Sequence, residues 1–119
     1  MTPTEFRRRA LAFPEALEGA HMGHADFRVG GRIFATLGSP DAGSAAVMLS
    51  PQDQHHLMHD YPRVFTPAAG KWGASGSTVI ALRAAKTPEV TAALEAAWRR
   101  RAPKRTVAEF DTRAPDDMR

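Results

Sequence analysis

Histidine and carboxylate side chains whose spacing could support acid–base chemistry come close together in one short segment. This segment contains Glu18, His21, His24 and Asp26. On an extended strand, Glu18 and His21 point to opposite faces, whereas His24 and Asp26 share a face and could hydrogen-bond. Acid–base catalysis would also need a pocket around such a pair. We therefore favour a polar cluster that stabilises a turn, and we predict no catalytic residues and no enzymatic activity.

A second group of histidines consists of His55, His56 and His59. His55 and His59 stand four residues apart on a predicted helix, so their imidazoles could share one metal ion. No glutamate follows His55 as in the zinc-protease motif, and the chain has no cysteine to complete a thiolate site. We therefore predict neither a metal site nor a cofactor.

Two arginines flank a pair of glycines in the first half of the chain. Gly30-Gly31 predicts a two-residue hairpin turn, because both central positions of a type I′ turn need a positive φ. Arg28 and Arg32 then lie beside the tip of the hairpin. Such a tip could touch nucleic-acid phosphates, although it is also an ordinary solvated hairpin end.

A glycine-rich segment at residues 70–77 carries Lys71 and Trp72. It lacks the order of a phosphate-binding P-loop and precedes a strand, so no helix N-terminus is available. In a loop, Lys71 could contact a phosphate and Trp72 could stack on a base. Trp72 could also pack onto the core, and we favour that second interpretation. The predicted nucleic-acid contacts are Arg28, Arg32, Lys71 and Trp72.

The charge of the chain is distributed unevenly. The 119 residues hold 16 basic and 13 acidic side chains, a net charge of +3. Residues 106–119 carry a net charge of −2, which leaves +5 on residues 1–105. A basic domain favours an anionic partner such as DNA. Solvated helix faces in an arginine-rich chain are the competing explanation.

Three segments share a helix-start pattern of a hydroxyl residue, a proline and an acid. They lie at Thr2–Glu5, Ser50–Asp53 and Thr87–Glu89. Each predicted helix ends at a later proline, and these are Pro14, Pro62 and Pro103. In the last helix, the apolar stripe places Trp98 in the core.

The segments between these helices favour strands. Residues 17–37 are rich in β-forming residues, and the hairpin turn places Val29 opposite Arg32 and Phe27 opposite Phe34. Further extended segments are predicted at 45–49, 63–66 and 77–83. The sequence therefore predicts an α+β fold, in which a mainly antiparallel sheet of about five strands packs against three helices in the order α-β-β-β-α-β-β-α.

Residues 18–37, EGAHMGHADFRVGGRIFATL, resemble the signature of the MmcQ/YjbR-like family. Later blocks that also resemble this family are Leu49–Pro51 with Gln54, Lys71–Gly73 with Ser77–Val79, and Ala97–Arg99 with Ala102–Arg105. The resemblance covers about residues 2–105. Ala25 stands where the family commonly has proline.

The resemblance implies a curved antiparallel sheet packed against helices, similar to the secretion-chaperone-like and CyaY-like arrangements. It is also similar to the double-wing DNA-binding domain of a phage transcription factor. It implies no catalytic residues and no role for His21 or His24. We therefore predict a DNA-binding module that acts through the basic hairpin and the sheet face. The alternative is a protein-interaction, chaperone-like or small-ligand-binding module.

The remaining expectations concern organisation. We predict one domain at residues 1–105, followed by a polar, flexible tail at 106–119. No apolar run of 18 residues predicts a membrane span, and we expect a cytoplasmic protein. Besides DNA or another anionic partner, we expect a monomer or a weak homodimer.

Overall fold

Each of the three helices predicted from a capping pattern begins within one residue of its expected start. The backbone N–H of Glu5 donates to the Thr2 hydroxyl at 3.1 Å, and that of Asp53 donates to the Ser50 hydroxyl at 3.0 Å. Both predicted caps are therefore confirmed. The last predicted start is shifted by one residue, because Thr87 is already helical and the Lys86 N–H donates to the Glu89 carboxylate at 3.3 Å.

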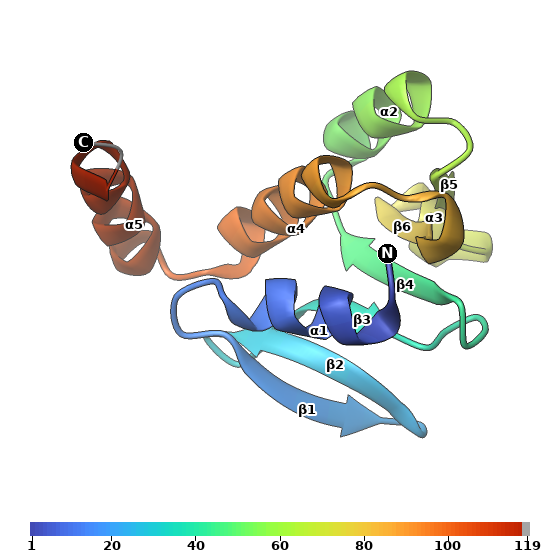
Figure 1. The fold of residues 1–119 in the computed structure, drawn as a ribbon, viewed down its shortest axis with the longest axis horizontal. Helices are drawn as coiled ribbons and strands as arrows, with labels where there is room; N and C mark the ends of the chain where they lie inside the picture. Colours follow the sequence, from blue (N-terminus) through green and yellow to red (C-terminus); the bar gives the residue numbers. More distant parts are fainter. Residues whose placement is uncertain (118–119) are drawn as a thin grey trace.

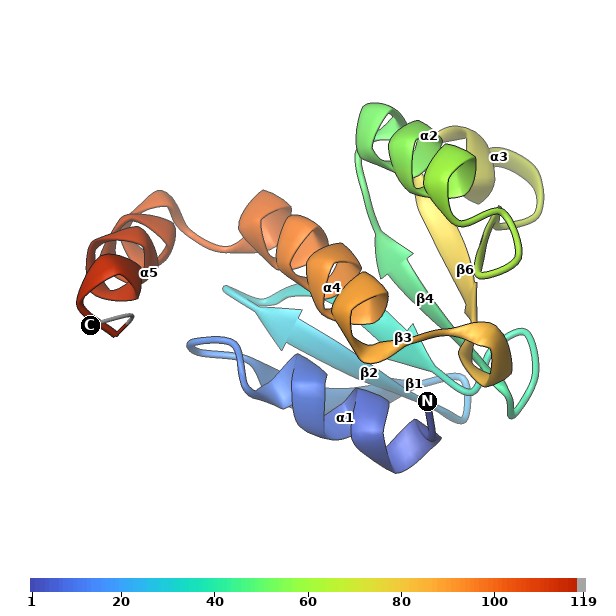
Figure 2. The ribbon, with the colours of Figure 1, turned by 45° about the horizontal axis from the view of Figure 1, so that its top comes forward.

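The computed structural model describes residues 1–117, and the side chains of residues 1–113. Its elements, in chain order, are α1 Pro3–Leu11, β1 Leu17–His21, β2 His24–Val29, β3 Arg32–Leu37, β4 Ser44–Met48, α2 Pro51–Asp60, β5 Phe65–Pro67, α3 Gly70–Ala74, β6 Ser77–Ala81, the 3₁₀ turn η1 Leu82–Ala84, α4 Thr87–Arg101 and α5 Lys104–Asp117. The strands form one antiparallel sheet in the order β1-β2-β3-β4-β6-β5. Helices α1 and α4 cover the same face of this sheet (Figures 1 and 2).

The β2–β3 hairpin forms as predicted at its tip but not along its length. Gly30 and Gly31 have φ of 59° and 77°, which confirms the two-residue turn. Val29 pairs with Arg32 as expected. The register then shifts between Arg28 and Phe27, so that Phe27 pairs with Ala35 and not with Phe34. The predicted Phe27–Phe34 pair is therefore wrong, because a β-bulge inserts one extra residue into β3.

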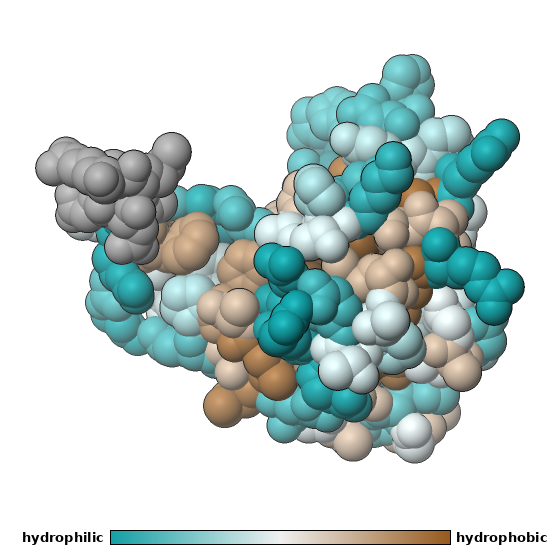
Figure 3. Space-filling view, in the orientation of Figure 1, coloured by the Kyte–Doolittle hydropathy of each residue, from teal (hydrophilic) through white to brown (hydrophobic). Residues whose placement is uncertain are grey.

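The hydrophobic core lies between the sheet and helices α1 and α4. Trp98 is fully buried, which confirms its predicted place, and its indole N–H donates to the carbonyl of Pro14 at 3.0 Å. The other largest buried side chains are Phe6, Phe27, Phe34, Phe65, Leu49, Ile80, Leu82 and Leu94. Seen from the side of α1 and α4, hydrophilic residues cover the α2 end and hydrophobic ones reach the surface on the side toward α5 (Figure 3).

The α+β class is as predicted, but the element count differs from the sequence expectation. The described residues form six strands where about five were expected, and five α-helices where three were expected. Helix α3 lies where a loop was predicted. Helix α5 lies where a flexible tail was predicted, and its Phe110 ring packs 5.0 Å from the ring of Trp98. This anchor was not predicted, because a single aromatic residue among charged neighbours gives little hydrophobic signal. Residues 118–119 of the predicted tail lie outside the described residues.

No helix in the described part of the chain is long and apolar enough to cross a membrane.

Candidate ligand-binding site

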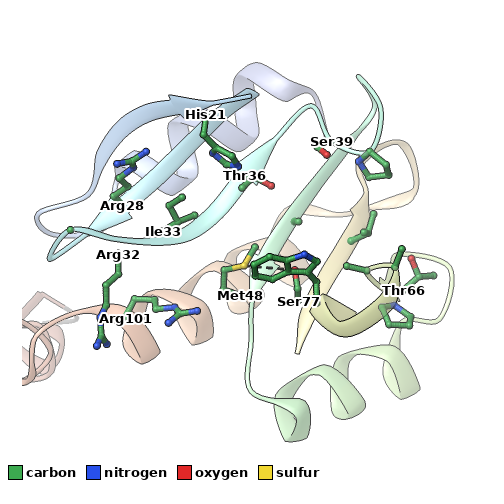
Figure 4. Close-up of a pocket in the computed structure, with 18 residues that line it drawn as sticks. His21, Arg28, Arg32, Ile33, Thr36, Ser39, Met48, Thr66, Ser77 and Arg101 are labelled. Carbon is green, nitrogen blue, oxygen red and sulfur yellow. Dashed lines mark hydrogen bonds between the residues drawn. The ribbon is translucent and has the colours of Figure 1, made fainter. Parts of the chain in front are cut away.

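The sheet face away from α1 and α4 is hollowed. Alternation along β4 sends Ala45 and Val47 into the core, whereas Ala46 and Met48 point the other way. Strand β6 follows the same rule, and Ser77 joins the second face. The resulting hollow has a volume of about 870 Å³ and receives side chains from every strand (Figure 4). We call it the open-face hollow.

Arginines gather at one end of this hollow. Arg28, Arg32 and Arg101 line it, and among the side chains that the structure describes no aspartate or glutamate does. Figure 4 shows Arg32 and Arg101 close together. A smaller hollow of about 430 Å³ shares these two residues and adds Arg100 and Lys104. The electrostatic character of the site is therefore cationic, and it is strongest where the β2–β3 hairpin meets the end of α4.

Arg101 is the most constrained cation of this group. Burial lowers the pKa of its guanidinium, and the nearby charges of Arg100 and Arg32 lower it further. Its Nε atom is buried and has no hydrogen-bond partner among the described residues. A buried donor without a partner costs about 1–3 kcal/mol. An anion in the hollow would relieve the repulsion between these guanidinium groups.

Asp26 holds two of the residues that line the hollow, Arg28 and His21. Its side chain is fully buried beneath Arg28 and His21. The Arg28 guanidinium donates to both carboxylate oxygens, at 2.7 Å and 2.9 Å, and His21 Nδ1 lies 2.7 Å from Oδ2. The hydrogen bond from Arg28 lowers the pKa of Asp26, burial opposes this change, and His21 adds to it. Arg28 is therefore held by an internal partner, unlike the free tip arginine that the sequence analysis expected.

The polar cluster predicted from the sequence is only partly assembled. Asp26 bonds His21 and not His24, whose ring centroid lies 6.4 Å from that of His21. The expected His24–Asp26 hydrogen bond is therefore wrong. Glu18 faces the opposite side of β1, as predicted, and it binds Arg7 of α1 at 3.1 Å.

Trp72 lies on α3 and is 74% exposed, so the favoured interpretation that it packs onto the core is wrong. Its indole lines the open-face hollow, while the neighbouring Lys71 is exposed and does not line it. Gln54 of α2 fixes this region, because its amide donates to the carbonyls of Gly73 and Ser77 at 3.0 Å and 3.2 Å. The side chain of Trp72 is thus presented to the hollow by an anchored turn of helix.

The remaining arginines near the end of α4 are neutralised by partners. Arg99 binds Asp111 at 2.6 Å and Glu95 at 2.9 Å, and these contacts raise the pKa of its guanidinium. Arg105 binds Glu109 at 3.0 Å. The run of basic residues therefore divides into two groups. Arg99 and Arg105 pair with carboxylates, whereas Arg100 and Arg101 contact no described carboxylate, and Arg100 donates to the Met48 carbonyl at 3.4 Å.

The predicted helix histidines do not form a metal centre in the described part of the chain. No three histidine, aspartate or glutamate side chains gather there at metal-binding distance. His55 and His59 are exposed on α2, and His59 contacts Asp60 at 3.2 Å.

Sequence reasoning missed Arg101 as a site residue, because its place beside the apolar stripe of α4 suggested a structural role. The structural reason is that Pro103, which ends the helix, packs on the hairpin tip. Its ring lies 3.1 Å from where a Cβ on Gly30 would stand, so the helix end and the hairpin tip meet. Because these segments are far apart in the sequence, no local sequence pattern predicts their contact.

Comparison with known proteins adds a family and a fold. The YjbR family model matches residues 11–100. The crystal structure of the Deinococcus radiodurans protein DR2400, with the domain DUF419, superposes with a TM-score of 0.67 at 15% identity, over 82% of this chain and 75% of that one. At this identity the similarity concerns the fold alone. None of the curated proteins compared with the chain matches it. Because the family model spans most of the sequence, the chain belongs to the YjbR family.

Proposed function

We propose that this chain binds single-stranded DNA across the open-face hollow. The observation that supports this most strongly is the group formed by Arg32, Arg100 and Arg101. These cations lie close together, and none of the described acidic side chains lines either hollow. Like charges held together raise the free energy of the unliganded site, and a polyanion lowers it. A phosphate backbone is the polyanion that arginine forks bind best.

The exposed side chain of Trp72 favours single-stranded DNA over other polyanions as the ligand. Proteins that hold single strands combine a cationic groove with exposed aromatic rings on which bases stack. The hollow provides both, with the indole of Trp72 and the guanidinium groups of Arg32 and Arg101 on one lining. If a base stacked on the indole, the phosphate of the same nucleotide could bind to the arginines.

The hairpin geometry disfavours a wing that contacts duplex DNA. A free wing needs a projecting tip, but Gly30 at the tip lies against Pro103. Arg28 is engaged by Asp26, and Arg32 lines both hollows. A hollow of about 870 Å³ is the size of pockets that take small organic groups. It suits an unpaired nucleotide better than the continuous surface of a duplex.

The test is fluorescence anisotropy with labelled oligo(dT) of about 12 nucleotides, which is within the site size of known single-strand binders. Three phosphate contacts predict that affinity falls roughly 20-fold between 50 and 200 mM salt. Arg32→Ala should weaken binding and make the salt dependence shallower.

The matched control is Arg83→Ala, which removes the same charge from an exposed position outside both hollows. Equal losses for Arg32→Ala and Arg83→Ala would mean that net charge and not the hollow drives binding. Tighter binding of a duplex of the same length would contradict the single-strand proposal.

The apolar floor of the hollow favours a second candidate, a small aromatic anion such as a nucleotide. Alanine, proline and methionine side chains line much of its floor, as in small-molecule pockets. The same anisotropy experiment separates the two candidates through competition with thymidine monophosphate. If the mononucleotide competes as strongly as the unlabelled oligonucleotide, the small anion is the ligand.

A further inference from the structure

Asp26, Arg28 and His21 form a tightly packed, hydrogen-bonded cluster on the open face. Its central carboxylate is fully buried and accepts three hydrogen bonds from the other two side chains. Gly19 lies opposite Asp26 on β1. A Cβ on Gly19 would stand 2.9 Å from the Asp26 carboxylate and 3.1 Å from Arg28 Nε, so a larger residue would displace the cluster. Packing against β1 therefore fixes the Asp26–Arg28 pair, and the hydrogen bond to Asp26 positions the imidazole.

Asp26 also determines which nitrogen of His21 carries a proton. An ionised carboxylate only accepts hydrogen bonds, so Nδ1 of His21 is the donor in the 2.7 Å contact. The ring lines the hollow, and Nε2 has no hydrogen-bond partner in the described part of the chain. A neutral ring offers Nε2 as an acceptor. A protonated ring offers Nε2–H as a donor with a positive charge.

We propose that protonated His21 is a phosphate contact of the single-strand site, so that strand binding takes up a proton. This inference rests on the proposed function and names the residue that makes the site sensitive to pH. A phosphodiester oxygen accepts from Nε2–H of His21. The Nη1 group of Arg28, which Asp26 does not use, donates to the same phosphate.

The two charged groups beside the His21 ring offset each other. The groups that face the ring are Asp26, Arg28 and His24 from β2, Thr36 from β3 and Ser39 from the loop before β4. Asp26 and Arg28 neutralise each other, and Thr36 and Ser39 are uncharged. The Arg7–Glu18 ion pair lies on the opposite face of β1. A proton on His21 therefore adds one positive charge at the place where the strand's phosphate binds.

The expected consequence is tighter binding at lower pH. An ordinary imidazole titrates near pH 6.5, whereas thymine and an internal phosphodiester do not titrate between about pH 5.5 and 8. A hydrogen bond from a charged donor is stronger than one involving a neutral ring, which corresponds to about fivefold in affinity. Oligo(dT) without a terminal phosphate should thus bind about fivefold more tightly at pH 5.5 than at pH 8, at constant ionic strength.

The experiment measures oligo(dT) anisotropy at both pH values for the wild-type chain and three variants. His21→Gln keeps a hydrogen-bonding side chain and loses the proton, and it should bind with less than about twofold dependence on pH. His24→Gln removes the neighbouring imidazole, and His59→Gln removes one on α2, far outside the hollow. Both controls should keep the wild-type pH dependence. A wild-type pH dependence that survives in His21→Gln overturns the proposal.

A second measurement keeps this proposal separable from the proposed function. Inorganic sulfate resembles phosphate and does not titrate in this range, and at pH 5.5 it should shift the imidazole NMR signals of His21 and not those of His59. If oligo(dT) fails to bind but sulfate shifts His21, the single-strand function fails and the anion contact stands. If sulfate leaves His21 unchanged at pH 5.5, the anion contact is overturned whether or not oligo(dT) binds.

Discussion

The two tryptophans of this chain belong to opposite faces of one sheet and have opposite environments. Trp98 is fully buried, with the Phe13 ring stacked 5.6 Å away and the Phe110 ring 5.0 Å away. Trp72 is 74% exposed at the rim of the open-face hollow. On the covered face, apolar side chains fill the space between the sheet and the helices. On the open face, exposed aromatic and cationic groups are held in place by hydrogen bonds and by an anchored helix turn.

This contrast separates stability from binding. A residue on the covered face contributes mainly to the free energy of folding, because removing it leaves a cavity in a packed core. A residue on the open face contributes mainly to ligand affinity, because it is already in contact with solvent. The following variants test whether the two roles are divided in this way.

The largest expected effect is on the covered face. Trp98→Ala should lower the free energy of unfolding by about 4 kcal/mol, because it leaves a large cavity and an unpaired Pro14 carbonyl. Trp72→Ala should change it by less than about 0.5 kcal/mol, as is usual for exposed side chains. Urea denaturation followed by circular dichroism measures both values. Similar losses in the two variants would remove the distinction between the faces.

Asp26→Asn tests a buried carboxylate on the open face that we expect to stabilise the fold. At pH 7 it should cost about 2 kcal/mol, because the charged hydrogen bonds to Arg28 and His21 are weakened. The folded state lowers the pKa of Asp26 from its ordinary value of 3.8, so its ionisation stabilises the fold above that pH. This stabilisation is lost as the pH falls through the lower folded value.

The stability difference between wild type and Asp26→Asn should therefore shrink below about pH 4. Urea titrations at pH 7, 4 and 2.5 measure it. A difference that stays constant over this range would show that the carboxylate charge does not contribute to stability. The same titrations on Asp60→Asn, which alters an exposed carboxylate at the end of α2, provide the control.

Trp72→Ala should weaken oligo(dT) binding about tenfold, because stacking on one aromatic ring contributes about 1–3 kcal/mol per base. Trp72→Phe keeps an aromatic face and should recover most of the affinity. The measurement is anisotropy at a fixed salt concentration. Full affinity in Trp72→Ala would mean that the exposed indole is not a contact of the strand.

The smallest expected effect concerns an arginine that lies close to the site but is already paired. Arg99→Ala removes two ion pairs at the surface, with Glu95 and Asp111, and should cost no more than about 1 kcal/mol of stability. Its effect on oligo(dT) affinity should be less than twofold. A loss as large as that of Arg32→Ala would extend the binding surface toward α5.

Local chemistry made part of this structure predictable. The caps at Thr2 and Ser50 and the turn at Gly30-Gly31 depend on residues that are neighbours in the chain. The apolar stripe that buries Trp98 depends on helical periodicity alone. These features were therefore accessible from the sequence.

The site depended on contacts between distant segments and was predicted less well. His24 was chosen as the partner of Asp26 because both belong to one strand, but the cross-strand neighbour His21 makes the bond. Trp72 was expected in the core because large aromatic residues are usually buried. Arg101 reaches the hollow only because the end of α4 packs on the hairpin, which no local pattern encodes.

The most direct test of the division between the two faces uses the two indole N–H signals in a ¹H–¹⁵N NMR spectrum. The chain has only two tryptophans, so each face has one reporter. On titration with oligo(dT), the Trp72 signal should shift progressively to saturation, and the Trp98 signal, whose N–H is bound to Pro14, should stay in place. A shift of Trp98 with Trp72 unchanged would contradict the assignment of the open face as the binding surface.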